Sequence, residues 1–198
     1  MAAPETLRSI LCAETWLWND GTTSITFYEN GTGRLVCTTE LTAWIVAELD
    51  WKAHDPSHLD QVVTLDNSSW NPTTISDFSI EMTLTTRRPP DGPASDYPGR
   101  VNEHWLHDNA FRPKTYHLKL EQGRFRNQFD IMHKVRDGLQ YALRLVFDPS
   151  PLPPDGEWNE ESHGPHAMKL WEYTQFNARK YEEKDLGLWD KLMVWYEK

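Results

Sequence analysis

Glu48 and Asp50 are the two residues whose types and spacing most directly suggest chemistry, and they lie in the stretch TAWIVAELDWK from Thr42 to Lys52. In a β-strand, residues two apart share a face and lie roughly 6.5–7 Å apart along the chain. If this face lines a cavity, both carboxylates can meet one ligand. Confinement beside Trp44 would favour the protonated form of one carboxyl, which could then donate a hydrogen bond or act as a general acid.

The same strand has a second interpretation, in which this face points to solvent. Charged side chains are rarely buried without partners. Glu48 and Asp50 would then be solvated, and Trp44 would be covered by a loop or by the C-terminal helix. The opposite face is core under both interpretations and carries Ala43, Ile45, Ala47, Leu49 and Trp51. Three further polar candidates have the same outward-facing alternative: Tyr116, Tyr141 and Arg144.

Other catalytic patterns are weaker. Three histidine pairs fall in predicted loops, without helical spacing or a third ligand, so no metal site is predicted. These pairs are His54 and His58, His104 and His107, and His163 and His166. There is no G-x-S-x-G elbow, P-loop or dinucleotide fingerprint, so no cofactor is predicted. Gly31 and Gly33 form a G-x-G that precedes a strand-like segment, and Asn30-Gly31 predicts a β-hairpin turn instead.

Composition limits the class of protein. A chain of 198 residues suits one domain spanning 1–198. Thirty acidic against 20 basic residues give a net charge of −10 without a basic block, which disfavours nucleic acid and anionic membranes as partners. We expect a cytoplasmic protein, because no signal peptide or membrane span is visible and Cys12 and Cys37 are too few for a disulfide framework.

Strand-like segments follow one another at short intervals after an opening strand around ETWLWND. Several alternate between apolar and polar residues, as in the run from Phe78 to Leu84. The predicted strands are Thr23 to Tyr28, Arg34 to Thr39, Thr42 to Trp51, Gln61 to Leu65, Phe78 to Arg87, Thr115 to Glu121, Arg124 to Phe129, Leu139 to Phe147 and Lys169 to Phe176. We predict an all-β chain with one antiparallel barrel, in preference to a sandwich.

Two helices and two long loops complete the expected fold. A short N-terminal helix begins near Pro4 and buries Leu7, Ile10 and Leu11, and a C-terminal helix within 180–198 packs on the barrel. The loops at 87–114 and 148–168 are rich in proline and glycine at their starts. Loops of this length are either lids at a barrel mouth or insertions without a function.

A short helix, an opening aromatic strand, a hairpin meander and a closing helix together resemble the calycin or lipocalin group. Glu14 stands where the lipocalin signature has a glycine before its tryptophan, here Trp16. The passages NGTGRLVCTTELTAWIVAELDWK, FRPKTYHLKLEQGRF and LRLVFDPSPLPPDGEW are similar to small fungal barrel proteins of natural-product pathways. Some of those are cofactor-free cyclases and isomerases, including hetero-Diels–Alderases that join a tropolone-derived quinone methide to a sesquiterpene.

The resemblance implies a cofactor-independent cyclase or pericyclase for a hydrophobic terpenoid or polyketide intermediate. An aromatic barrel can hold two flat reactants in a near-attack arrangement. The expected acid is Glu48 or Asp50. The expected walls of the ligand site are Trp16, Trp18, Trp44, Phe78, Met82, Tyr116 and Tyr141. The alternative is a non-catalytic carrier for a small apolar ligand, and a third interpretation is an interaction domain with a filled barrel. A homodimer is compatible with each of these.

Overall fold

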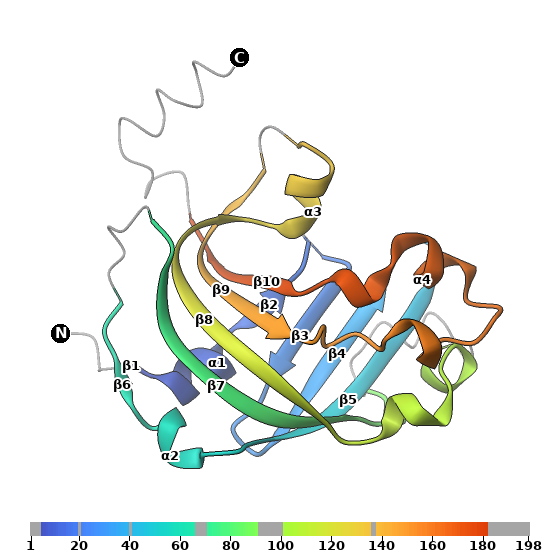
Figure 1. The fold of residues 1–198 in the computed structure, drawn as a ribbon, viewed down its shortest axis with the longest axis horizontal. Helices are drawn as coiled ribbons and strands as arrows, with labels where there is room; N and C mark the ends of the chain where they lie inside the picture. Colours follow the sequence, from blue (N-terminus) through green and yellow to red (C-terminus); the bar gives the residue numbers. More distant parts are fainter. Residues whose placement is uncertain are drawn as a thin grey trace.

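The computed structural model describes residues 5–19, 21–39, 41–65, 71–90, 101–135 and 138–181. Its centre is a closed antiparallel barrel with strand order β10-β2-β3-β4-β5-β7-β8-β9 (Figure 1). The strands are Thr15–Leu17 (β2), Thr23–Phe27 (β3), Thr32–Thr38 (β4), Ala43–Ala53 (β5), Thr73–Leu84 (β7), Lys114–Arg126 (β8), Gln140–Asp148 (β9) and Gln175–Lys180 (β10). The predicted all-β barrel is therefore confirmed, and the sandwich is excluded.

The β3–β4 hairpin forms where Asn30-Gly31 predicts it. Gly31 has a φ of 82°, which a side chain would disfavour. The Asn30 carboxamide oxygen accepts a hydrogen bond from the amide of Thr32 at 3.0 Å. Burial alternates along both strands, so the period-2 pattern of the sequence directly gives the inner face of the barrel.

A small cap covers one end of the barrel, which we call the α1 end. It contains β1 (Glu5–Thr6), α1 (Leu7–Ala13), α2 (Pro56–Leu59) and β6 (Val62–Val63). The predicted N-terminal helix is confirmed, and its buried residues are Leu7, Ile10 and Leu11. It begins later than expected from Pro4, because Thr6 is its N-cap and also pairs with Val62. The strand predicted around Val62 therefore belongs to the cap and not to the barrel.

The described helical parts of the two long loops lie at the other end, which we call the loop end. These are η2 (Asn102–His104), η3 (Asp108–Phe111), η4 (Asp155–Glu157), α4 (His163–Met168) and η5 (Leu170–Glu172). The buried Asn102 side chain accepts from the amide of Val46 at 2.8 Å and donates to its carbonyl at 2.9 Å. Asn102 thus binds the β5 backbone where the ladder with β7 does not reach, since that ladder pairs only Leu49 to Ala53 of β5.

Three predicted strands have wrong boundaries. The strand predicted from Phe78 to Arg87 is β7, which begins at Thr73 and ends at Leu84. Arg124 to Phe129 is not a separate strand: β8 continues through a bulge to Arg126, and α3 (Gln128–Met132) follows. Gly123 lies inside this irregular stretch with a φ of 157°, so the glycine bends a strand instead of ending one. The last strand begins at Gln175, not at Lys169, because Lys169 adopts a left-handed conformation that ends α4.

The barrel closes between β10 and β2 through a short ladder that pairs Asn177 with Leu17. Beside it, the Gln128 carboxamide oxygen accepts from the Trp18 indole at 3.0 Å and from the Thr174 amide at 3.1 Å. Trp18 also stacks on Tyr173, with ring centroids 3.5 Å apart. The first residue of α3 therefore connects Trp18, just after β2, with Thr174, just before β10.

Most of the buried side chains of the strands, α1 and the loop end form one hydrophobic cluster. Within the described ranges, no helix is long and apolar enough to cross a membrane. The predicted C-terminal helix lies outside the described residues.

We predict that Asn102→Gly lowers the free energy of unfolding by about 1–3 kcal/mol, because two buried backbone groups lose their partner. Asn102→Ala should cost about 1 kcal/mol more, since Asn102 has a φ of 52° and a Cβ is unfavourable there. Urea unfolding measures both, with the exposed Asn109→Ala of the same loop as a control expected within about 0.5 kcal/mol. A wild-type stability for Asn102→Gly would show that this amide does not hold β5.

Candidate functional site

Glu48 and Asp50 lie on the outer face of β5, so the expectation that both line the inside of the barrel is wrong. Arg87 reaches both of them: its Nε is 2.9 Å from Glu48, and its terminal nitrogen contacts Asp50. The two acidic side chains are 32% and 50% exposed. This agrees with the alternative interpretation of the strand, in which the acids face solvent.

Trp44 shares this outer face, yet it is only 6% exposed. Its ring lies against Gly164 of α4, where an added Cβ would come within 2.6 Å of the indole. Val46, two residues further along this face, is fully buried and packs with Val101, which precedes η2. The outer face of β5 thus has two environments. Its first half, with Trp44, is covered by the loop end, and its second half, with Glu48 and Asp50, is exposed and pairs with Arg87. Trp44 does not line the inside of the barrel.

The other predicted wall residues are buried inside. Trp16, Trp18, Phe78, Met82, Tyr116 and Tyr141 are each at most 6% exposed. Trp16 donates its indole N–H to the Leu11 carbonyl at 3.1 Å, which fixes the ring against the end of α1. Trp18 is held by Gln128 and Tyr173 as described above. These contacts give both tryptophans a packing role, whether or not a ligand also meets them.

Tyr116 is the inward-facing polar group near the loop end. Its ring packs edge-to-face on Phe147 at 6.4 Å. Burial, together with the negative charge of Glu157, raises the pKa of Tyr116 well above its usual value, so its hydroxyl stays protonated at neutral pH. Glu157 itself is paired with Lys114.

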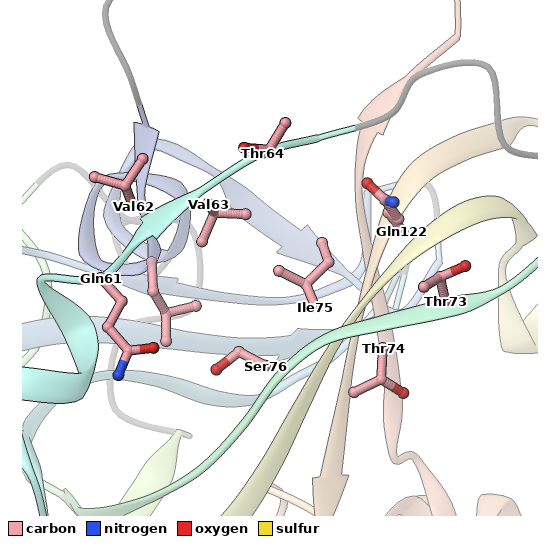
Figure 2. A pocket seen from close by; sticks show the side chains of 10 residues that line it. Gln61, Val62, Val63, Thr64, Thr73, Thr74, Ile75, Ser76 and Gln122 are labelled. Atoms are coloured by element: carbon pink, nitrogen blue, oxygen red, sulfur yellow. The ribbon is translucent and has the colours of Figure 1, made fainter.

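A pocket of about 280 Å³ opens at the α1 end (Figure 2). One side is the segment 61–64 with Leu7 behind it, and the other is the segment 73–76 with Gln122. Leu7, Val63 and Ile75 supply apolar surface, while the threonines, Ser76 and the glutamines supply hydrogen-bonding groups. We call this the α1-end pocket. None of the residues predicted from the sequence as site residues lines it.

The α1-end pocket continues the inner face of the barrel. Ser76 pairs with the buried Leu120 and Thr73 pairs with Gln122, and paired residues of antiparallel strands lie on the same face. The β7–β8 ribbon pairs with β5 only from Ile80 of β7 onward. The ribbon thus extends beyond its contact with β5, and the pocket lies between this extension and the cap.

Ser76 and His58 meet beside this pocket. The Nε2 atom of His58 is 3.0 Å from the Oγ atom of Ser76. A register shift between Thr74 and Ser76 precedes the serine, and such bulges redirect side chains. His58 sits on α2, which is started by Asp55 as N-cap and by Pro56 at its first position. Hydrogen bonds from Ser57 lower the pKa of Asp55.

Sequence reasoning considered His58 only as half of a histidine pair for a metal. In the described ranges, no three His, Cys, Asp or Glu residues gather as a metal site would require. The partner of His58 is Ser76, 18 residues away. The available signals were the D-P helix start before His58 and the polar stretch NPTTIS before Phe78, but neither shows that the two elements meet.

We predict that Glu48→Gln and Asp50→Asn each change the free energy of unfolding by less than about 1 kcal/mol, because half-exposed ion pairs contribute little. Chemical denaturation measures this. A loss above about 2 kcal/mol for either variant would mean that these acids are more enclosed than the arrangement with Arg87 implies.

We also predict that neither cysteine reacts readily in the native protein. Burial raises the pKa of Cys12 to about 11, with a contribution from Glu29, and burial raises that of Cys37 to about 12. At pH 8 the Cys12 thiolate fraction is then only about 0.1%, so alkylation by iodoacetamide should be roughly 100-fold slower than in unfolded protein and should accelerate as pH rises. Native labelling as fast as in urea would contradict this.

Comparisons of the chain with protein-family models, with curated proteins and with solved structures find no match. The candidate site is therefore described by its geometry: a small pocket between the cap and the β7–β8 ribbon, with a serine–histidine pair at one side.

Proposed function

We propose that this chain binds a small neutral molecule that carries both apolar and hydrogen-bonding groups in the α1-end pocket. The observation that carries the proposal is the composition of this pocket, in which Leu7, Val63 and Ile75 provide apolar contact beside several hydrogen-bonding side chains. Six of the ten lining residues carry hydrogen-bonding side chains, so the ligand needs polar groups of its own to replace the water that it displaces from them.

The size of the pocket limits the ligand. Its volume of about 280 Å³ lies just below the roughly 300 Å³ at which typical pockets for drug-sized molecules begin. A single small molecule suits this space better than a pair of large reactants. The lining residues carry no charged side chain, so a neutral ligand avoids an unpaired buried charge.

This proposal corresponds to the carrier interpretation of the sequence. It keeps the expectation of a small ligand, but it adds hydrogen-bonding groups to that ligand and moves the site from the middle of the barrel to its α1 end. The wider assignment to calycin-like barrels of natural-product pathways belongs to the same proposal. Its support is an antiparallel barrel of eight strands with a short helix before the first of them.

A cofactor-free cyclase is the second candidate, and Tyr116 is the observation that favours it. A buried phenol that stays protonated can polarise a carbonyl or assist loss of water. In this proposal Tyr116 takes the role that the sequence suggested for Glu48 or Asp50. Tyr116→Phe should then abolish formation of a cyclised product while leaving ligand binding intact, whereas unchanged product formation would remove Tyr116 from the mechanism.

Native mass spectrometry against a panel of small terpenoid and aromatic compounds tests the binding proposal. Thr73→Trp places a bulky ring at the α1-end pocket and should weaken retention of a bound compound at least 10-fold, because the ring occupies ligand space. Thr115→Trp is the matched control, since Thr115 is equally an exposed threonine but lies on the outer face of β8 opposite Glu81.

Two results would contradict the binding proposal. No retained compound across the panel would mean that the pocket does not bind small neutral molecules of these classes. Equal retention by wild type and Thr73→Trp would mean that the ligand binds elsewhere on the chain. If Tyr116→Phe also abolished formation of a cyclised product, the ligand site would be at the loop end.

A further inference from the structure

We propose that Ser76 and His58 form a catalytic pair that transfers the acyl group of a small carboxylic ester to water. This inference rests on the proposed binding of a small molecule in the α1-end pocket. The Oγ of Ser76 lies 3.0 Å from the Nε2 of His58, which is within reach for an imidazole that accepts the hydroxyl proton. Ser76 also lines the pocket, so a bound ester can approach the hydroxyl.

Local structure holds both residues in place. Ser76 follows the bulge in β7 and lies opposite the buried Leu120 of β8, so the serine is fixed to a ladder of the barrel. His58 is on α2, and its ring lies 6.3 Å from the ring of Phe78. A nucleophile and a base on rigid elements keep their alignment without a large entropic cost on binding.

The pocket also offers a donor for the charge that develops on the ester oxygen. The lining residues with side-chain amide groups are Gln61 and Gln122. In Figure 2 the Ser76 hydroxyl points to the side of the pocket where the Gln61 carboxamide lies, with the carboxamide oxygen on the side of the serine. Rotation of this carboxamide about its last side-chain bond would turn the N–H group toward a bound ester. An N–H donor placed near the attacked carbonyl stabilises the tetrahedral intermediate.

The reaction conserves atoms and charge. The Ser76 oxygen attacks the ester carbonyl while His58 accepts the hydroxyl proton, and the tetrahedral intermediate forms. Its collapse breaks the carbon–oxygen bond to the alcohol, which leaves with the proton returned by His58. Water then attacks the acyl-serine with His58 as base, and the products are the free carboxylic acid and the unmodified serine. No oxidant, reductant or metal is consumed.

A second serine–histidine pair, formed by Ser79 of the same strand and His117 of β8, serves as a control. The Oγ of Ser79 lies 3.3 Å from Nδ1 of His117, and Nε2 of His117 lies 2.6 Å from Asp77. This pair is on the outer face, where the His117 side chain is 53% exposed, and it does not line the α1-end pocket. It has a carboxylate partner but no pocket, so comparing the two pairs separates the effect of the pocket from that of the residue types.

The experiment is labelling of the full chain by a small alkyl fluorophosphonate, which forms a stable phosphonyl ester on an activated serine and releases fluoride. Intact-mass spectrometry detects one adduct, and peptide mapping locates it. Hydrolysis of p-nitrophenyl acetate and butyrate is measured in parallel. We expect a single adduct at Ser76 and a hydrolysis rate that falls roughly 100-fold or more in Ser76→Ala and in His58→Gln.

Matched variants keep the test decisive. Ser79→Ala and His117→Gln should label and hydrolyse like wild type. His58→Gln retains a side chain that can hydrogen-bond to Ser76, so its loss of labelling with unchanged circular dichroism and melting temperature cannot be attributed to unfolding. An adduct at Ser79, full hydrolysis by Ser76→Ala, or no adduct at all would overturn the proposal.

The outcome also separates this inference from the binding proposal. Retention of neutral compounds by native mass spectrometry without any phosphonyl adduct would leave the binding proposal standing and remove the catalytic pair. Loss of both retention and labelling would contradict both proposals.

Discussion

Closure of the barrel at the β10–β2 seam is the constraint on which the rest of the structure depends. The ladder there pairs Asn177 with Leu17, far less contact than the β8–β9 or β4–β5 ladders provide. Side chains supplement it: Gln128 binds across the seam, and Trp18 stacks on Tyr173 with planes 6° apart. A sheet that closes in this way has no long exposed edge and hides one face of every strand.

Ion pairs also link the last strand of the barrel to the N-terminal part of the chain. Arg179 of β10 binds Glu14, which follows α1, at 2.6 Å and Glu5 of β1 at 2.5 Å. The hydrogen bonds with Glu5 and Glu14 raise the pKa of Arg179, and the hydrogen bonds with Arg179 lower the pKa of Glu5. The cap is therefore attached to β10, the last strand of the barrel, as well as to β2, the first one. This attachment fixes one wall of the α1-end pocket relative to the barrel.

Because the inner face is filled by large apolar side chains, polar chemistry is displaced to the ends. At the loop end, the negative charge of Glu157 acts on the buried hydroxyl of Tyr116. At the α1 end, the β7–β8 ribbon extends beyond its contact with β5, and the inner-face position of Ser76 becomes accessible beside the cap. The two candidate functions differ in which end they use: binding with ester hydrolysis uses the α1 end, and the cyclase uses Tyr116.

The sequence predicts the elements more reliably than their junctions. The alternation that begins at Phe78 coincides with the buried positions of β7, although alternation alone does not tell which face is the inner one, and Asn30-Gly31 correctly marked a hairpin. Gly123 misled, because a glycine within a bulged strand has the same local signature as one in a turn. The partners of Glu48 and Asp50 were not predictable either, since Arg87 meets them only when β7 lies beside β5.

The site was the least predictable part for the same reason. Ser76 and His58 belong to different elements, and their contact depends on a one-residue register shift in β7 together with the position of α2 under the barrel. Short-range sequence patterns predict neither the register shift nor the position of α2. What the sequence does contain is the helix start at Asp55-Pro56 and the alternation after Phe78, from which the two elements, though not their meeting, can be derived.

The most direct test of the account is mapping of amide and methyl chemical-shift changes by NMR while the isotope-labelled full chain is titrated with small neutral aromatic and terpenoid compounds. The account predicts changes that cluster on Leu7, Val63, Ile75 and Ser76 around the α1-end pocket. Changes confined to the loop end, around Tyr116 and Leu106, or no saturable change at all, would contradict the assignment of this pocket as the ligand site.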